Sequence, residues 1–179
     1  MSTERKAGDA SESITFRLKP DILAALRKEC ERNSLTLNVL VCQILNHFTN
    51  WSSTAARAGF VPVPRQILMS VLSGATVEEA AGLGRAVVEN QASDIMLLRR
   101  GAVSKEALIA IFEAWLKEAG MPYSKSVRDG STLRVVHHDL GTKWSILTST
   151  ALHEVYGRVL QKKARTEYTE NTLVLQVES

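Results

Sequence analysis

The feature that most constrains this chain is a short alternating segment near its start. Polar and apolar side chains alternate strictly through Ser13, Ile14, Thr15, Phe16, Arg17 and Leu18. Strict alternation is typical of a β-strand that buries one face, yet a single short strand is unstable because its backbone groups lack partners. The sequence predicts no other strand before about residue 123, so we expect this segment to pair with a second copy of the chain.

Two helices are predicted to follow this segment. The first starts at Lys19-Pro20-Asp21, because proline fits the first turn of a helix and aspartate favours its positive end. It ends at Asn33 and Ser34, where the asparagine is expected to adopt the left-handed cap conformation. Thr36 is the predicted N-cap of a second helix that runs to about Trp51 and is apolar on more than one face.

The order of strand, helix, turn and helix resembles the ribbon-helix-helix family of DNA-binding proteins. The resemblance covers residues 12–50 and depends on the patterns Ile14-x-Phe16-Arg17-Leu18, Lys19-Pro20-Asp21 and Ser34-x-Thr36-x-Asn38. In that family two chains pair their strands into an antiparallel ribbon that lies in the major groove of double-stranded DNA. The resemblance therefore implies a homodimer, with higher oligomers left open.

The same resemblance implies which groups contact DNA. Ser13, Thr15 and Arg17 would face the base edges, where arginine bonds guanine bidentately and hydroxyl groups donate or accept. The backbone N–H groups at Thr36, Leu37 and Asn38 would hold a phosphate at the positive end of the second helix. The expected function is that of a sequence-specific transcriptional regulator, in particular a repressor.

Charge alone does not indicate DNA binding. The chain has 22 basic and 19 acidic residues and a net charge of +3. Residues 1–51 carry seven basic and six acidic side chains. Three other interpretations stay open: an architectural, chromatin-type DNA-binding protein, an antitoxin-like module that binds a partner protein, and an edge strand with a helical hairpin packed on the rest of the chain.

The rest of the chain is predicted to be α+β. Helices are expected from about Arg65 to Gly74, from a capping box at Thr76 and Glu79 to about Asn90, from Ser104 to Gly120, and over about Thr142–Lys163. Strands are expected over Tyr123–Arg128 and Thr132–His138, on either side of the turn Asp129-Gly130, and over Asn171–Glu178. This order gives a small ββαβ domain. If residues 93–99 form a strand, the order becomes βαββαβ, which is ferredoxin-like.

These elements suggest four regions. We expect a disordered tail over residues 1–10, the ribbon-helix-helix over 11–51, a linker over 52–63, and a helical plus α+β dimerisation or effector domain over 64–179. The block from His138 to Ser145, with Trp115–Lys117 before it and Thr169–Thr172 after it, looks like a group of archaeal proteins of undefined function. That second resemblance spans residues 60–178 and implies no ligand.

His138, Lys143 and Trp144 form a candidate effector site at the last strand-to-helix junction. In a competing interpretation His138 hydrogen-bonds the turn and Trp144 belongs to the core. Nickel-responsive repressors join a ribbon-helix-helix to a domain that binds metal through His and Cys. The C-terminal half has no cysteine here, and the neighbouring His137 and His138 point to opposite faces of a strand, so we expect no metal site.

Other classes of function lack their usual signatures. The chain contains no Gly-x-Ser-x-Gly elbow, no P-loop and no dinucleotide fingerprint, so neither enzymatic activity nor a cofactor is expected. It has no apolar run of about 18 residues and no apolar signal-peptide core, so we expect a cytoplasmic protein without a membrane partner. Cys30 and Cys42 lie in the two predicted helices and are expected to be buried, reduced thiols.

Overall fold

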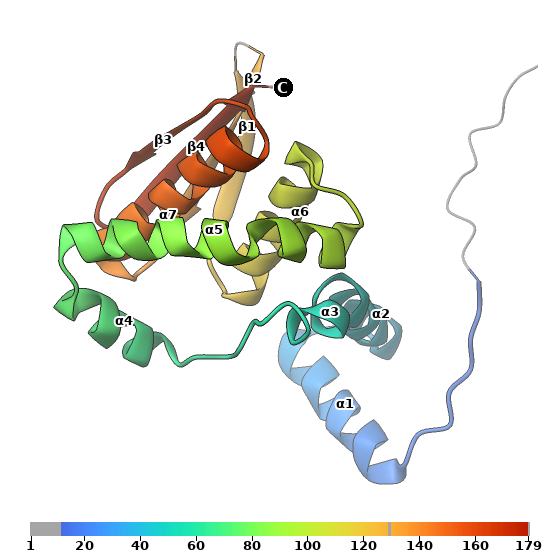
Figure 1. The fold of residues 1–179 in the computed structure, drawn as a ribbon. Coiled ribbons are helices and arrows are strands. Elements are labelled where there is room, and N and C mark those ends of the chain that lie inside the picture. Colours follow the sequence, from blue (N-terminus) through green and yellow to red (C-terminus); the bar gives the residue numbers. More distant parts are fainter. Residues whose placement is uncertain (1–11, 129, 179) are drawn as a thin grey trace, which may run out of the picture. The chain divides into compact units, whose positions relative to one another are not determined.

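The computed structural model describes residues 12–128 and 130–178, which form a mixed α+β fold (Figure 1). The elements in chain order are α1 (Pro20–Asn33), α2 (Leu37–His47), the π-helical turn η1 (Phe48–Ser52), α3 (Ser53–Ala55), α4 (Arg65–Gly74), α5 (Val77–Arg100), α6 (Lys105–Glu118), β1 (Tyr123–Arg128), β2 (Ser131–His137), α7 (Gly141–Glu154), the π-helical turn η2 (Val155–Val159), β3 (Ala164–Tyr168) and β4 (Thr172–Glu178). The chain divides into two compact units, residues 1–46 and 47–179. Among the described residues, no helix has the length and apolar character needed to cross a membrane. The expected tail over residues 1–10 lies outside the described residues.

The predicted strand over residues 13–18 is not formed in the single chain. Residues 12–19 belong to neither a helix nor a strand, and the side chains of residues 12–19 are exposed. The sheet of the second unit contains only β1 to β4 among the described residues, so this segment pairs with no strand of its own chain. A strand requires a partner backbone, and the ribbon therefore remains a proposal that needs a second chain.

Helix α1 begins as predicted, with Pro20 in the first turn and an extended Lys19 before it. Its C-terminal cap differs from the prediction, because Ser34 and not Asn33 adopts the left-handed conformation, with φ of 53°. Asn33 stays helical because its side-chain amide donates to the carbonyl oxygen of Glu29 at 2.9 Å. The backbone N–H of Leu35 then closes the end of the helix by donating to the carbonyl oxygen of Cys30.

Helix α2 has the predicted cap. The hydroxyl of Thr36 accepts from the backbone N–H of Val39 at 3.3 Å, and its carbonyl oxygen accepts from Leu40 at 3.0 Å. The helical path is longer than expected, because η1 and α3 follow α2 directly and extend it to Ala55. Part of the segment expected to be a linker is therefore helical.

Helix α5 resolves the ambiguity over residues 93–99. Thr76 and Glu79 form the predicted capping box, and the helix continues to Arg100, where Gly101 ends it with φ of 69°. Val88 and Met96 are both buried and lie at helical spacing, so the apolar face continues through the ambiguous stretch. The ferredoxin-like alternative is therefore wrong, because its first strand is part of a helix.

The sheet is antiparallel throughout, with strand order β1-β2-β4-β3. The predicted hairpin and last strand are confirmed, and Leu173, Leu175 and Val177 are buried as expected. The predicted long helix ends earlier, because α7 stops at Glu154 and the π-helical turn η2 continues it only to Val159. Strand β3, which was not predicted, follows over residues 164–168 and pairs with β4. The order of elements is therefore ββαββ where ββαβ was expected.

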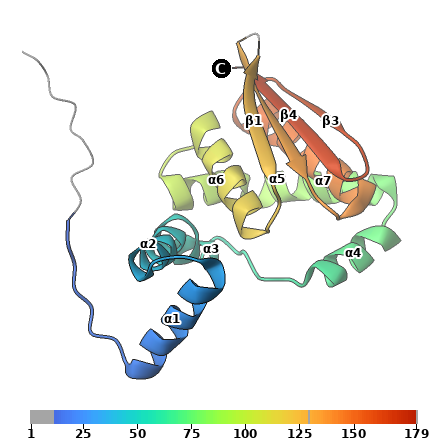
Figure 2. The same ribbon diagram turned by 180° about the vertical axis from the view of Figure 1, so that it is seen from behind.

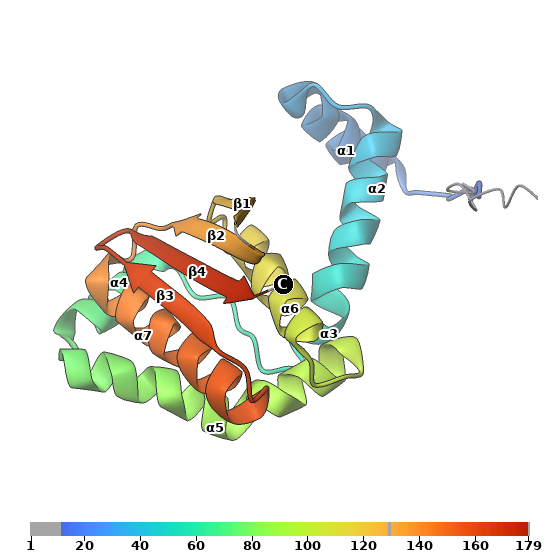
Figure 3. The ribbon, with the colours of Figure 1, turned by 90° about the horizontal axis from the view of Figure 1, so that it is seen from above.

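The second unit is layered. Helices α6 and α7 lie against one face of the sheet, and α5 crosses on the side away from it (Figures 1 and 3). The other face of the sheet is turned towards the viewer in Figure 2. Gly84 allows α5 to approach α7, because a Cβ atom at this position would lie 2.4 Å from the carbonyl oxygen of Leu147. Side chains of the three helices and the sheet form one core, which includes Met96, Phe112, Trp144, Tyr156 and Leu175.

Candidate functional site

The predicted base-contacting residues lie in the extended segment before α1. The side chains of Ser13, Thr15 and Arg17 are all exposed. The intervening apolar side chains are exposed as well, with 72% of Ile14 and 50% of Phe16 accessible to solvent. In the single chain the polar and the apolar side chains of this segment are therefore both exposed.

The predicted phosphate-contacting residues are at the start of α2. Thr36 is the N-cap, and Leu37 and Asn38 form the first turn. Backbone N–H groups in the first turn of a helix have no partner within the helix. Residues 34–46 contain no lysine, arginine, aspartate or glutamate, so no side-chain charge opposes the positive end of the helix dipole. Anion binding at this end of α2 stays a prediction.

The first unit buries little of its apolar surface. Cys30 and Leu40 are the buried residues among those described before residue 47. Ile22, Val39 and Ile44 each keep more than 40% of their surface exposed. Cys42 is exposed, which corrects the expectation of a buried thiol. An apolar surface such as that of α2, a helix without charged residues, is normally covered in a folded protein. In the single chain it stays exposed.

His138 lies at the junction between β2 and α7 and is 3% exposed. Its Nδ1 accepts from the backbone N–H of Leu140 at 3.3 Å, and its Nε2 lies 2.9 Å from the hydroxyl of Ser145. The Ser145 hydroxyl in turn donates to the carbonyl oxygen of Thr169 at 2.9 Å. This chain of bonds fits a neutral imidazole with its proton on Nε2.

The electrostatics agree with that protonation state. Burial lowers the pKa of His138, and the nearby His137 lowers it further, against the opposing effect of Asp139. The ring packs on Trp144 with 4.1 Å between centroids, and Trp144 stacks on Trp115. These contacts match the interpretation in which His138 orders the turn.

The three predicted effector residues do not form one open site. His138 and Trp144 are buried against each other, whereas the amino group of Lys143 reaches away and donates to the carbonyl oxygen of Ala75 at 2.9 Å. Lys143 lines a pocket of about 430 Å³ together with Met69 and Glu170. As an effector site the three residues remain a prediction.

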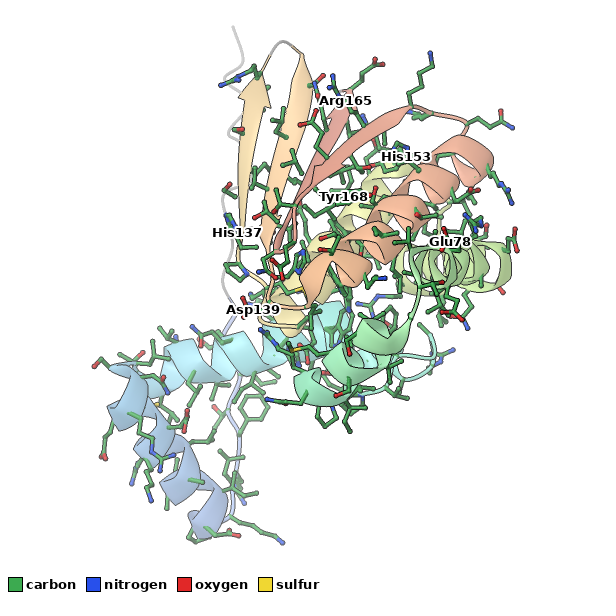
Figure 4. All side chains as sticks on the ribbon, turned by 90° about the vertical axis from the view of Figure 1, so that its left-hand side faces the viewer. Glu78, His137, Asp139, His153, Arg165 and Tyr168 are labelled. Atoms are coloured by element: carbon green, nitrogen blue, oxygen red, sulfur yellow. The ribbon has the colours of Figure 1, made fainter. Side chains whose placement is uncertain are left out.

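His153 lies apart from His137 and Asp139 (Figure 4). His137 and Asp139 lie near one end of the sheet, whereas His153 lies towards the other end of α7 (Figure 4). Within residues 12–128 and 130–178, no three His, Cys, Asp or Glu side chains form a group that could hold a metal ion.

Two features were missed by the sequence analysis. The first is a partly buried ion pair between β2 and α6, where Nε of Arg134 lies 2.6 Å from a carboxylate oxygen of Glu113. The second is an apolar pocket of about 260 Å³ between α5, α6 and α7. The pocket had one signal in the sequence: Thr148 interrupts the apolar face that Trp144, Ala151 and Val155 form along α7 and the start of η2.

No family model, curated protein or solved structure matches this chain. The resemblances over residues 12–50 and 60–178 therefore remain predictions. A functional proposal for this chain therefore depends on its residues and their geometry.

Proposed function

We propose that this protein is a homodimeric, sequence-specific DNA-binding regulator that reads the major groove with an antiparallel ribbon. Each ribbon strand comes from residues 13–18 of one chain. The C-terminal α+β unit then assembles the dimer or senses a signal.

The observation that carries this proposal is the exposed alternating segment. Ile14, Phe16 and Leu18 keep 72%, 50% and 43% of their surface exposed in the single chain. Exposing such a stripe is unfavourable by about 25 cal/mol for each Å² of apolar surface. Pairing with a second copy satisfies the backbone groups of both segments and turns both apolar stripes to the same side, over the apolar residues of α2.

A second copy fits better than a different partner. Residues 12–46 contain five basic and four acidic side chains, so two copies approach without strong repulsion. The described part of the first unit, residues 12–46, is shorter than the length of about 40 residues below which a unit usually needs oligomerisation, a metal or disulfides to fold. The two cysteines are not bonded to each other.

The polar side of such a ribbon suits DNA. Two arginines at position 17 would bond guanines bidentately, and the hydroxyls of Ser13 and Thr15 would add contacts with either polarity. Phosphates flanking the ribbon would bind at the first turn of each α2.

Selection of binding sites from random double-stranded DNA, followed by measured affinities at fixed salt, tests the proposal. The wild-type protein should select an inverted repeat. Arg17→Ala should weaken binding by about 10- to 100-fold at one position of each half-site and relax the base preference there. Arg17→Lys should keep the charge and still lose preference, because lysine cannot bond guanine with a planar fork.

Arg57→Ala is the matched control, since Arg57 is an exposed arginine outside the segment. It should bind the selected site as the wild type does. Equal affinity for all DNA sequences at fixed salt would contradict the proposal and favour an architectural protein. An unchanged base preference in Arg17→Ala would exclude Arg17 from base recognition.

A further inference from the structure

We propose that a pocket beside η2 and β3 binds a small molecule that carries more than one phosphate group. We call it the basic pocket, because Lys162, Lys163 and Arg165 line it. This inference does not depend on DNA binding. It concerns only the second unit.

The basic pocket lies where the chain leaves η2 and enters β3. Its volume is about 500 Å³, and pockets for small ligands usually measure about 300–1,000 Å³. His153 of α7 and Arg165 of β3 both line it, and Figure 4 shows them on the same part of the molecule. The pocket is therefore large enough for a small organic molecule.

The lining of the basic pocket has an excess of positive charge. Of the described residues that line it, Lys162, Lys163 and Arg165 are basic and Glu178 is acidic, which gives a net charge of +2 without the histidine. Lys105 adds a further positive charge beside it, because its Nζ donates to the carbonyl oxygen of Glu178 at 2.9 Å. A cleft lined by charges of one sign attracts ions of the other sign. Lysine and arginine are both common phosphate ligands.

The basic side chains are weakly neutralised by their neighbours. Neither Lys162 nor Lys163 forms an ion pair with another described residue. The pKa of Glu106 is lowered mainly by a backbone hydrogen bond, and Lys162 makes the smallest contribution to this shift. Arg165 pairs with Glu167 at 2.8 Å, but these side chains are 74% and 64% exposed, so the pair is weak. An anionic ligand can therefore bind all three cations.

Gly157 supplies a second, independent observation. It lies in η2, four residues after His153, and both residues line the pocket from the same side of the helix. Glycine destabilises a helix relative to alanine. Its φ is not in the left-handed region, and a Cβ atom would have no neighbouring atom within 4 Å, so neither the backbone nor the packing requires glycine here. Close approach of a ligand to the backbone of η2 would require it.

The backbone around Gly157 is also unusual. The turn η2 is π-helical, and such turns often occur at functional sites. In the loop that follows, Gln161 adopts the left-handed conformation with φ of 50°, which is uncommon for a residue other than glycine. Both features lie directly before Lys162 and Lys163, so the local backbone agrees with a binding site at this position.

Calorimetric titration of the full-length protein at about 0.15 M salt tests the proposal with pyrophosphate and inorganic phosphate as probes. Pyrophosphate should bind at one site per chain. It should bind at least about tenfold more tightly than phosphate, because it can contact more than one of the cations at once. Absence of pyrophosphate binding, or equal affinity for both probes, would overturn the proposal.

A pair of double variants tests the role of the two lysines. Lys162→Ala/Lys163→Ala should weaken pyrophosphate binding by about 10- to 100-fold, because it removes two charge-assisted hydrogen bonds. Lys117→Ala/Lys125→Ala is the matched control, since it removes two exposed lysines that do not line the pocket. It should bind pyrophosphate as the wild type does. Equal weakening in both double variants would show attraction by net charge alone and refute the site.

Gly157→Leu distinguishes a pocket from a cluster of surface charges. Leucine adds no charge, favours a helix and meets open space at this position, so the variant should fold. It should fill part of the pocket and weaken pyrophosphate binding at least about tenfold. Unchanged affinity in the folded variant would contradict the proposal.

A measurement on the wild-type protein covers the case in which Gly157→Leu does not fold. Pyrophosphate should shift the backbone amide NMR signals of Gly157, Lys162 and Lys163. Shifts confined to residues 36–38 would instead place the probe at the start of α2 and overturn the proposal.

A DNA titration distinguishes a small phosphorylated molecule from the phosphates of DNA. Lys162→Ala/Lys163→Ala should bind double-stranded DNA of random sequence as the wild type does. A loss of DNA affinity in this variant that matches its loss of pyrophosphate affinity would make the two lysines contacts to the DNA backbone, against the proposal.

Discussion

At the scale of single residues, His138 is a buried titratable group whose environment differs clearly from water. Its Nδ1 accepts a backbone hydrogen bond and its Nε2 bonds Ser145, so both ring nitrogens are occupied only when the ring is neutral. Ser145 is itself completely buried, and its hydroxyl links the start of α7 to the turn before β4. Protonation of His138 would remove the Nδ1 acceptor and place a charge in this buried network, which the nearby Asp139 offsets only in part.

This arrangement predicts how stability depends on pH. Because burial lowers the pKa of folded His138, the unfolded chain takes up this proton first as the pH falls. The contribution to stability is therefore complete above the unfolded pKa of about 6.5 and is lost as the pH falls below that value towards the folded pKa. Urea unfolding at pH 8, 7, 6 and 5 should show the decline.

The His138→Gln variant should lose the part of this decline that comes from the imidazole. His153→Gln is the control, because His153 is exposed on the far part of α7 and should leave the decline in place (Figure 4). An identical pH dependence in His138→Gln and the wild type would contradict this role.

At the scale of elements, the contact between α5 and α7 depends on one glycine. A Cβ atom at Gly84 would lie 2.4 Å from the carbonyl oxygen of Leu147 and 3.1 Å from Cβ of Thr150. Gly84→Ala should therefore destabilise the protein by about 1–3 kcal/mol, because backbone cannot move away easily and the helices must separate. The midpoint of urea unfolding measures this loss.

Gly82 provides a matched comparison in the same helix. A Cβ atom there would meet only the end of the flexible Arg85 side chain, at 4.0 Å. Gly82→Ala should therefore stabilise the protein by about 0.5–1 kcal/mol, since alanine favours a helix. If the two substitutions shifted the midpoint equally, close helix packing at Gly84 would not be the cause.

The elements that the sequence predicted well are those with local signals. Pro20, Thr36 and Ser104 mark helix starts, and the Thr76 capping box is formed as expected. Strand β3 was missed because its residues are mostly polar and it lies at the edge of the sheet, so it buries little. Such a strand is specified by its pairing with β4, which is not a local property.

The segment proposed to contact DNA was also predictable only where its signal is local. The alternation in residues 13–18 is local and visible in the sequence, whereas its pairing depends on a second chain. The apolar pocket was not predictable, because its walls come from helices α5, α6 and α7 and from Phe60, which are distant in the sequence. Only the polar Thr148 within the apolar face of α7 pointed to it.

At the scale of the whole molecule, each unit should be stabilised by a different kind of interaction. Residues 47–179 contain a core built from three helices and a sheet, which includes Leu116, Val136 and Tyr156, all completely buried. The first unit keeps Phe16, Val39 and Ile44 exposed. We therefore expect the second unit to be stable as a single chain and the first to depend on association.

This difference predicts two unfolding transitions in scanning calorimetry of the full-length protein. The first transition is the unfolding of the first unit. Its midpoint should rise as protein concentration increases a hundredfold, because dissociation accompanies unfolding and mass action opposes it. The midpoint of the other should stay constant. Phe16→Asp should lower the first midpoint and abolish its concentration dependence, because a carboxylate would be buried in the paired ribbon. Val127→Asp, which places the same charge on a residue 71% exposed in β1, should leave the first transition unchanged. If neither midpoint moved with concentration, the first unit would not be held by a second copy, and the ribbon could not form.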